Sequence, residues 1–210
     1  MSTLSKTEAK TVAAGKIKKM ALIGMMGAIS TILMLFEVPL PFLAPPFYEL
    51  DLSEVPVLIG SFSLGPVAGV TIELIKILLN LLINGTITAG VGELGNFLIG
   101  CSFILPASLI YKRKKDKKHA MVGLVSGITV MTVIGCVINA YVLLPAYSAG
   151  LELPMDVLID MGTQIHSSID SIMSFVILTV APFNLVKGIV ISIVTLILYK
   201  RISIFIKSHY

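Results

Sequence analysis

The sequence predicts an all-α membrane protein with six transmembrane helices and both termini in the cytoplasm. Of its 210 residues, 56% are hydrophobic and only 13% are charged, and the mean hydropathy is +0.96. Soluble domains are about 45–50% apolar and about 25% charged, so a soluble domain of this size cannot bury so much apolar surface. The apolar residues also fall into runs close to the roughly 20 residues that one bilayer crossing needs.

The spans follow one another between segments with loop chemistry. Residues 1–15 are polar and are expected to form a flexible cytoplasmic tail, with 16–210 forming one six-helix transmembrane domain. The segment after the first span is rich in proline, which lacks a backbone N–H, so an irregular first extracellular loop is expected. Asn84-Gly85 is typical of a later turn. The expected spans are about residues 17–36, 54–64, 66–83, 93–111, 120–144 and 182–202.

Positive charge supports six spans. Fourteen of the 16 Lys and Arg residues lie before the first span, in the 112–118 loop or near the C-terminus. Six spans put all three clusters on one side, which the positive-inside rule makes cytoplasmic. Residues 172–180 are apolar but too short to cross alone, and a separate crossing there would move the C-terminal cluster outside. They can also extend the last span, interrupted by Pro182. This distribution explains the basic pI without a nucleic-acid partner.

Two lysines lie within or beside apolar spans, where a charged side chain costs roughly 2.5–3.5 kcal/mol and usually faces a cavity or a partner. Lys76 is three residues after Glu73, so an intrahelical ion pair is one interpretation and a role in a cavity is the other. Lys187 shares a helix face with Asn184, which suits a polar ligand. The alternative for Lys187 is a side chain that extends to the membrane surface.

Four asparagines lie near the expected outer ends of their spans. Amides in a bilayer need hydrogen-bond partners, and interhelical bonds can supply them. Four on one side instead indicate a polar cavity open to the outside, and aromatic neighbours suit it to an amphipathic small molecule. One of these aromatics, Tyr141, can equally anchor the chain at the membrane surface. The residues concerned are Asn80, Asn96, Asn139, Asn184, Tyr141, Tyr147 and Phe183.

Other motifs predict little chemistry. His166 and Asp170 share a face, but two ligands are too few for a metal site, so no metal is expected. No phosphate-binding loop of the G-x-x-x-x-G-K-[ST] kind occurs, so any ATP chemistry is expected on another chain. Gly24 and Ala28 have the small-xxx-small spacing that lets another helix approach closely.

Seven segments together resemble the riboflavin-specific S-components (RibU type) of energy-coupling-factor (ECF) transporters. Their order along the chain is specific, and they cover most of it beyond residue 20. They are PLPFLAPP at 39–46, LDLSEVP at 50–56, FSLGPVAG at 62–69, IKILLN at 75–80, GNFL at 95–98, NAYVLLPAY at 139–147 and APFNLVKG at 181–188.

The resemblance implies a prokaryotic, multi-pass protein of the cell membrane that is not an enzyme. It implies high-affinity capture of riboflavin outside the cell, with the vitamin as transported ligand rather than cofactor. Delivery inward would need a transmembrane coupling subunit and a pair of ABC-type ATPases, with docking through Gly24 and Ala28, where the family has two alanines. The implied riboflavin-binding residues are Asn139, Asn184, Lys187, Tyr147, Phe183, Asn80, Lys76, Asn96 and Leu43.

Three alternatives stay open at this point. The chain can be an S-component for another vitamin, such as thiamine or biotin. It can be an intramembrane enzyme, although the pairs Glu73 with Lys76 and His166 with Asp170 lack a third catalytic member. It can also be a self-sufficient carrier coupled to an ion.

Overall fold

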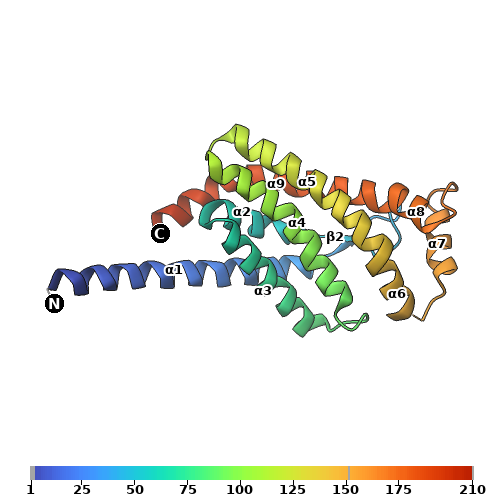
Figure 1. Ribbon diagram of the computed structural model, residues 1–210, viewed down its shortest axis with the longest axis horizontal. Coiled ribbons are helices and arrows are strands. Elements are labelled where there is room, and N and C mark those ends of the chain that lie inside the picture. The colour runs from blue at the N-terminus through green and yellow to red at the C-terminus, as the bar shows by residue number, and fades with distance from the viewer. Residues whose placement is uncertain (1–2, 151, 210) are drawn as a thin grey trace.

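The structure is a computed structural model that describes residues 3–150 and 152–209, with side chains described for 13–150 and 152–201. The described residues form helices, two π-helical segments and one pair of two-residue strands (Figure 1). The elements are α1 (Thr3–Met34), β1 (Val38–Pro39), β2 (Glu49–Leu50), α2 (Glu54–Leu64), α3 (Pro66–Asn84), α4 (Val91–Arg113), α5 (Lys117–Ile138), η1 (Asn139–Leu143), α6 (Leu144–Gly150), α7 (Met155–Thr163), α8 (Ile172–Phe175), η2 (Val176–Val180) and α9 (Ala181–His209).

Five helical segments are long and apolar enough to cross a membrane within the described ranges. Their bounds are Ala13–Met34, Pro66–Asn84, Val91–Arg113, Lys117–Gly150 and Ile172–Arg201. The remaining expected span, at 54–64, corresponds to α2. This helix has 11 residues and a length of roughly 16 Å at 1.5 Å per residue. It is too short to cross a bilayer core of about 30 Å alone. Nearly all of α2 is buried among its neighbours.

The beginning of α1, the end of α9 and the α4–α5 turn lie at the same end of the molecule (Figure 1). These are the places where the sequence concentrates its lysines and arginines. The large loops that join α1 to α2 and α6 to α9 lie toward the other end (Figure 1). Charge is therefore segregated along the long axis of the bundle.

The structure describes residues 3–15, which lie within the expected tail, as the first part of α1, which begins at Thr3. Ala, Lys and Glu favour helix, and the stretch 3–14 contains neither proline nor glycine. Polarity alone had suggested a tail. A segment can be polar and still helical where nothing breaks its backbone hydrogen bonds.

The proline-rich segment between α1 and α2 folds back onto the bundle. Its two ends pair as antiparallel strands, with Val38 opposite Leu50 and Pro39 opposite Glu49. Ala44 is fully buried, and Asp51 is 4% exposed. We call residues 35–53 the first loop. It is therefore a packed cover held at both ends rather than a free connection.

Residues 172–180 extend the last span, which was one of the two interpretations of the sequence, but without an interruption at Pro182. The segments α8, η2 and α9 run on as one helical stretch, and α5, η1 and α6 do the same past Pro145. A proline clashes with the carbonyl of residue i−4 and kinks an α-helix. A π-helical segment lies immediately before each proline-containing turn, with Leu144 N–H donating to Asn139 O and Ala181 N–H to Val176 O. These wider turns let both helices continue, and π-helical turns are frequent at functional sites.

The tightest helix contact joins α4 and α5. A Cβ added at Gly123 would lie 2.5 Å from Ala107 O, and one at Gly127 would lie 2.6 Å from Phe103 O. Small residues four apart thus let the two backbones touch, as in other helix pairs in membranes. This contact sets the positions of η1 and α6, which continue α5 toward the site.

Candidate functional site

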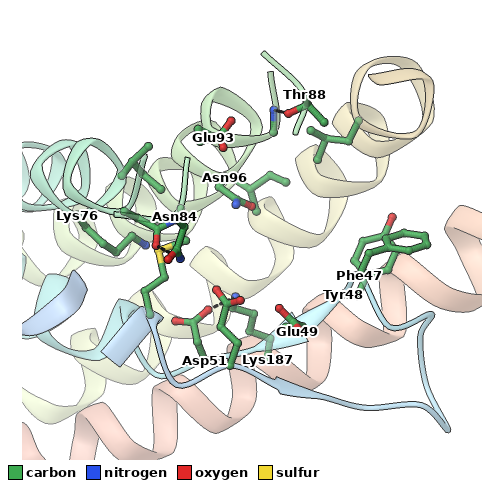
Figure 2. A pocket seen from close by; sticks show the side chains of 18 of the residues that line it. Phe47, Tyr48, Glu49, Asp51, Lys76, Asn84, Thr88, Glu93, Asn96 and Lys187 are labelled. Carbon is green, nitrogen blue, oxygen red and sulfur yellow. Dashed lines mark hydrogen bonds and ion pairs between the residues drawn. The ribbon is translucent and has the colours of Figure 1, made fainter. Parts of the chain in front are cut away.

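A cavity of about 440 Å³ lies between the first loop and the helices α3, α4, η1, α6 and α9. Figure 2 shows side chains of the first loop and of α9 on one side of it and those of α3 and α4 on the other. Its volume falls within the roughly 300–1,000 Å³ of typical small-molecule sites. It is larger than a second hollow of about 150 Å³ at the other end of the bundle.

The structure brings eight of the nine implied ligand residues to this cavity. Leu43 is the exception, since it lies in the first loop but does not line the cavity. Tyr141, one of the aromatic neighbours, is 72% exposed and is also absent from the lining. The residues brought together are Lys76, Asn80, Asn96, Asn139, Tyr147, Phe183, Asn184 and Lys187.

An aromatic wall forms one side of the cavity. The ring centres of Phe47 and Tyr48 are 4.9 Å apart, and those of Phe47 and Tyr147 are 5.4 Å apart. Tyr48 is also 5.6 Å from Phe183, with the rings tilted at 52°. Aromatic pairs at such distances stabilise one another by about 0.5–1.5 kcal/mol beyond their buried area. The wall joins the first loop to α6 and α9.

Asn139 connects this wall to the helix behind it. Its Oδ1 accepts a hydrogen bond of 2.6 Å from the Tyr48 hydroxyl, and its Nδ2 donates to Gly135 O at 2.8 Å. The side chain is only 2% exposed. A Cβ at Gly135 would lie 2.7 Å from Asn184 Nδ2, so this glycine leaves room for the second amide. The π-helical turn thus places Asn139 and Asn184 at one cavity.

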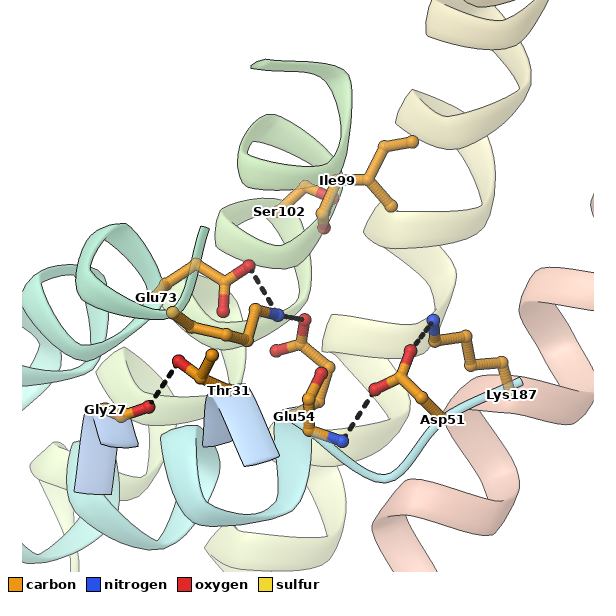
Figure 3. Close-up of polar contacts among 10 residues, drawn as sticks. Gly27, Thr31, Asp51, Glu54, Glu73, Ile99, Ser102 and Lys187 are labelled. Carbon is orange, nitrogen blue, oxygen red and sulfur yellow. Dashed lines mark hydrogen bonds and ion pairs between the residues drawn. The ribbon is translucent and has the colours of Figure 1, made fainter. Parts of the chain in front are cut away.

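Lys187 is held by a carboxylate of the first loop (Figure 3). Its Nζ is 2.8 Å from Asp51 Oδ2, and Asp51 Oδ1 accepts from Ser53 N–H at 2.6 Å. Burial of Asp51 favours its neutral form, but the ammonium groups of Lys187 and Lys76 outweigh that effect and lower its pKa to about 2. The pair bridges residues 136 apart in the sequence and closes the base of the loop.

Lys76 contacts two carboxylates at the inner end of the cavity, where Figure 3 shows Glu73 and Glu54 directed toward the same ammonium. Its Nζ is 2.7 Å from Glu54 Oε1 and 2.8 Å from Glu73 Oε1. The expected i,i+3 pair with Glu73 is therefore confirmed, and Glu54 joins it. A Cβ at Gly100 would lie 2.3 Å from Glu73 Oε1, so α4 makes room for this cluster. Lys76 and Glu54 also line the cavity.

Carboxylates surround the opening of the cavity. Glu37, Glu49 and Glu93 all line it, and Glu93 Oε2 accepts from the Thr86 hydroxyl at 2.9 Å. Partial loss of water around Glu37, together with the neighbouring charges of Glu49 and Asp51, raises its pKa to about 8. The opening therefore offers many hydrogen-bond acceptors, whereas Lys76, Asn139 and Asn184 are buried.

The cavity is also lined by Tyr48, Asp51 and Glu54, which no sequence pattern had pointed to. The four prolines before Phe47 predicted an irregular loop but not the direction in which it folds. A buried lysine needs a carboxylate, and Lys187 has none nearby in sequence. The missing carboxylate was the one sequence signal that an acidic residue from a distant part of the chain contacts Lys187.

The two residues implied in docking another subunit lie on the outer surface of α1. Gly24 and Ala28 are exposed, and a Cβ added at Gly24 would meet nothing within 4 Å. Gly27 on the same helix is buried, and a Cβ there would lie 2.5 Å from Ile75 Cγ2. Gly27 packs the helix against α3, whereas Gly24 and Ala28 remain available to a partner.

No group of three or more metal-ligating side chains occurs among the described residues. His166 Nδ1 instead accepts a hydrogen bond from Ser168 N–H at 3.3 Å, and Asp170 accepts from the Ser174 hydroxyl at 2.9 Å. The two side chains therefore serve local turns. Hydrogen bonds from Ser174 and Ser171 lower the pKa of Asp170, so it stays ionised.

Comparison with known proteins identifies the family. Residues 18–199 match the family model described as "ECF transporter, substrate-specific component". The riboflavin transporter RibU of Staphylococcus aureus (strain TCH60) is 40% identical over 190 residues, covering 90% of this chain and 93% of that protein. The riboflavin transporter FmnP of Bacillus subtilis (strain 168) is 32% identical over 195 residues, covering 92% of this chain and 96% of that protein.

A solved structure described as the S component of a bacterial ECF transporter is also similar. It superposes with a TM-score of 0.71 at 39% identity and covers 91% of this chain and 99% of its own. Sequence and fold thus agree over nearly the whole length, including every helix that lines the cavity. The chain belongs to the substrate-specific components of ECF transporters, which are transporter subunits rather than enzymes.

Proposed function

We propose that this chain is the high-affinity riboflavin-binding subunit of an ATP-driven vitamin uptake transporter. It captures riboflavin outside the cell and delivers it with a transmembrane coupling subunit and two ABC-type ATPases. The observation that carries the proposal is the convergence of eight implied ligand residues on one cavity of about 440 Å³. The names of the two relatives support riboflavin as the vitamin.

The chemistry of the cavity suits a flavin. The flat isoalloxazine ring lies against the wall of Phe47, Tyr48, Tyr147 and Phe183, because aromatic faces stack favourably on planar ligands. The amide and carbonyl edge of the ring alternates donors and acceptors, which the side-chain amides of Asn139 and Asn184 can complement. The Lys187 ammonium donates to a ring carbonyl or to a hydroxyl of the ribityl chain.

The acidic opening of the cavity suits the ribityl chain. Its hydroxyl groups are hydrogen-bond donors, and carboxylates are the strongest acceptors that side chains offer. Glu49 and Glu93 supply them around the opening, and Asn80 and Asn96 add amides. The apolar ring therefore enters first, and the polar chain remains near the outside.

The proposed topology has six crossings with both termini in the cytoplasm of a prokaryotic cell. The short helix α2 completes one crossing together with the buried base of the first loop. The three basic clusters then face the cytoplasm, as the positive-inside rule requires. Gly24 and Ala28 on α1 form the face that docks the coupling subunit, where small residues let its helices approach closely.

The proposal is tested by titrating riboflavin with the purified chain in detergent and following flavin fluorescence. Saturable quenching at one flavin per chain is expected, because stacking on tyrosine quenches the ring. Thiamine and biotin are expected not to compete. No quenching at micromolar protein, or equal competition by thiamine, would reject riboflavin as the ligand.

A matched pair of variants tests the site. Asn139→Leu and Tyr141→Leu change neighbouring residues of η1, but only Asn139 lines the cavity, while Tyr141 is 72% exposed. Asn139→Leu is expected to weaken riboflavin binding at least tenfold, and Tyr141→Leu less than twofold. Equal losses would place the ligand elsewhere.

Uptake assays test the coupling. Vesicles that hold this chain alone are expected to bind riboflavin without accumulating it. Vesicles that also hold the coupling subunit and both ATPases are expected to accumulate it when ATP is present inside. ATP-independent accumulation by the chain alone would favour a self-sufficient carrier.

A further inference from the structure

A second hollow, of about 150 Å³, lies at the basic end of the bundle. It sits where α2 turns into α3 beside the last turn of α4, and Gly65, Lys112 and Lys115 all line it. A Cβ added at Gly65 would meet nothing within 4 Å, so the space above this turn is open. None of these residues lines the large cavity.

Two cations line this hollow without an acidic partner among the described side chains. Lys112 and Lys115 are exposed and form no ion pair there, whereas Lys114 between them lies 3.7 Å from Asp116 Oδ2. The hollow also adjoins the N-terminus of α3, whose cap residue Gly65 offers no side-chain hydrogen bond. The free amides of a first helical turn carry partial positive charge, so both features favour an anion.

The hydroxyl groups in the same wall are engaged within the protein. Ser61 and Ser108 donate to Leu58 O at 2.9 Å and Ile104 O at 2.7 Å. Ser63 Oγ is hidden from solvent and lies within hydrogen-bond reach of the Tyr199 side chain. The charge that the hollow offers to an anion therefore comes from the two lysines and the helix N-terminus.

The surface beside the hollow is apolar. Val67, in the first turn of α3, is 80% exposed, and Leu109, one turn before Lys112, is 52% exposed. Both belong to helices long enough to span a membrane. A ligand that meets all these groups has an anionic head for the lysines and apolar chains for the helix surface. A free phosphate would contact only the lysines and not the apolar helix surface.

We propose that this hollow binds the phosphate group of an anionic phospholipid at the basic membrane surface of the protein. Lys112 and Lys115 bind the phosphate oxygens, and the acyl chains lie along Val67 and Leu109. Basic pockets between spanning helices are suited to anionic headgroups. The site lies apart from the flavin cavity and does not depend on the function proposed for it.

Native mass spectrometry of the full chain in a mild nonionic detergent tests this inference. The protein is titrated with phosphatidylglycerol, and with phosphatidylcholine, whose phosphate is offset by a fixed cation. One tightly held phosphatidylglycerol per chain is expected, with at least fivefold weaker retention in Lys112→Gln/Lys115→Gln. The matched control Lys117→Gln/Lys118→Gln removes the same charge from exposed neighbours that do not line the hollow and is expected to stay within twofold.

Three results would overturn the proposal. Equal losses in the two double variants would indicate diffuse attraction to the basic end. Equal retention of phosphatidylcholine would remove the role of net negative charge. Displacement of phosphatidylglycerol by millimolar inorganic phosphate would mean that the hollow takes a free oxyanion and that the apolar surface contributes nothing.

Discussion

The ion pair between Lys187 and Asp51 gives the most quantitative prediction. The pair is 2.8 Å long, and its side chains are 20% and 5% exposed. The pKa of Asp51 falls from 3.8 to about 2, which corresponds to about 2 kcal/mol of free energy of unfolding at neutral pH. Removal of one partner of a buried pair can cost about 3–5 kcal/mol, so a coupling near 2 kcal/mol is reasonable for a pair that retains some solvent.

A double-mutant cycle measures this coupling. The free energy of unfolding is compared for the wild type, Asp51→Asn, Lys187→Met and the double variant in mixed micelles. Each single variant is expected to lose about 2 kcal/mol, or about 4–8 °C in Tm for a chain of this size, and the double variant little more. The control cycle uses Lys114 and Asp116, which are 3.7 Å apart and more exposed, where a coupling below about 0.5 kcal/mol is expected.

The sign of the pH dependence is a second check on the same pair. Because folding lowers the pKa of Asp51, its contribution is complete above about pH 4 and is lost as pH falls toward 2. The stability gap between the wild type and Asp51→Asn should therefore close over that interval. A coupling below 0.5 kcal/mol, or a gap that persists at pH 2, would refute the assigned role of the pair.

Three further predictions concern the first loop and α1. Tyr48→Phe leaves the buried Asn139 Oδ1 without its 2.6 Å donor. Riboflavin binding, measured by fluorescence, should therefore weaken about 5- to 100-fold, at a cost of about 1–3 kcal/mol. Unchanged affinity would mean that this hydrogen bond does not hold the loop closed. The Glu37 pKa is raised from 4.5 to about 8, so the folded loop favours the neutral acid, and flavin affinity should fall as pH rises from about 5 to 8 and then level off. Glu37→Gln should be flat over this range, and a wild type equally flat would contradict the assignment. Gly24→Leu should leave Tm and riboflavin binding unchanged but abolish co-purification with a coupling subunit. Gly27→Leu should instead lower Tm, since of these two glycines only Gly27 packs against another helix. A lower Tm in both variants would contradict the assignment of Gly24 to a docking face.

Much of the fold could be predicted because the bilayer imposes simple rules. Apolar length and proline placement located five long spans and the irregular first loop. The start of α1 was missed because polarity suggested a loop while residue propensity favoured helix. The last span does extend from Ile172, as one interpretation of the sequence allowed, but it is not interrupted at Pro182, because a π-helical turn accommodates the proline. No sequence pattern measures that local relief, which depends on how the neighbouring helices pack.

The residues of the site were likewise only partly predictable from the sequence. Polar groups within apolar helices are rare and costly, so Lys76, Asn139 and Lys187 stood out in the sequence, and the structure brings them to one cavity. Tyr48 and Asp51 lie in a loop where polar residues are ordinary. Their importance arises from the direction in which the loop folds, and that direction is set by packing between residues more than 90 positions apart.

The central claim is that the amide- and lysine-lined cavity beneath the first loop holds riboflavin. A structure of the full chain purified with riboflavin tests it most directly. The account predicts flavin density in the cavity, with the ring against Phe183 and Tyr147 and polar contacts to Asn139, Asn184 and Lys187. Flavin density outside this cavity, or an empty cavity at saturating riboflavin, would contradict it.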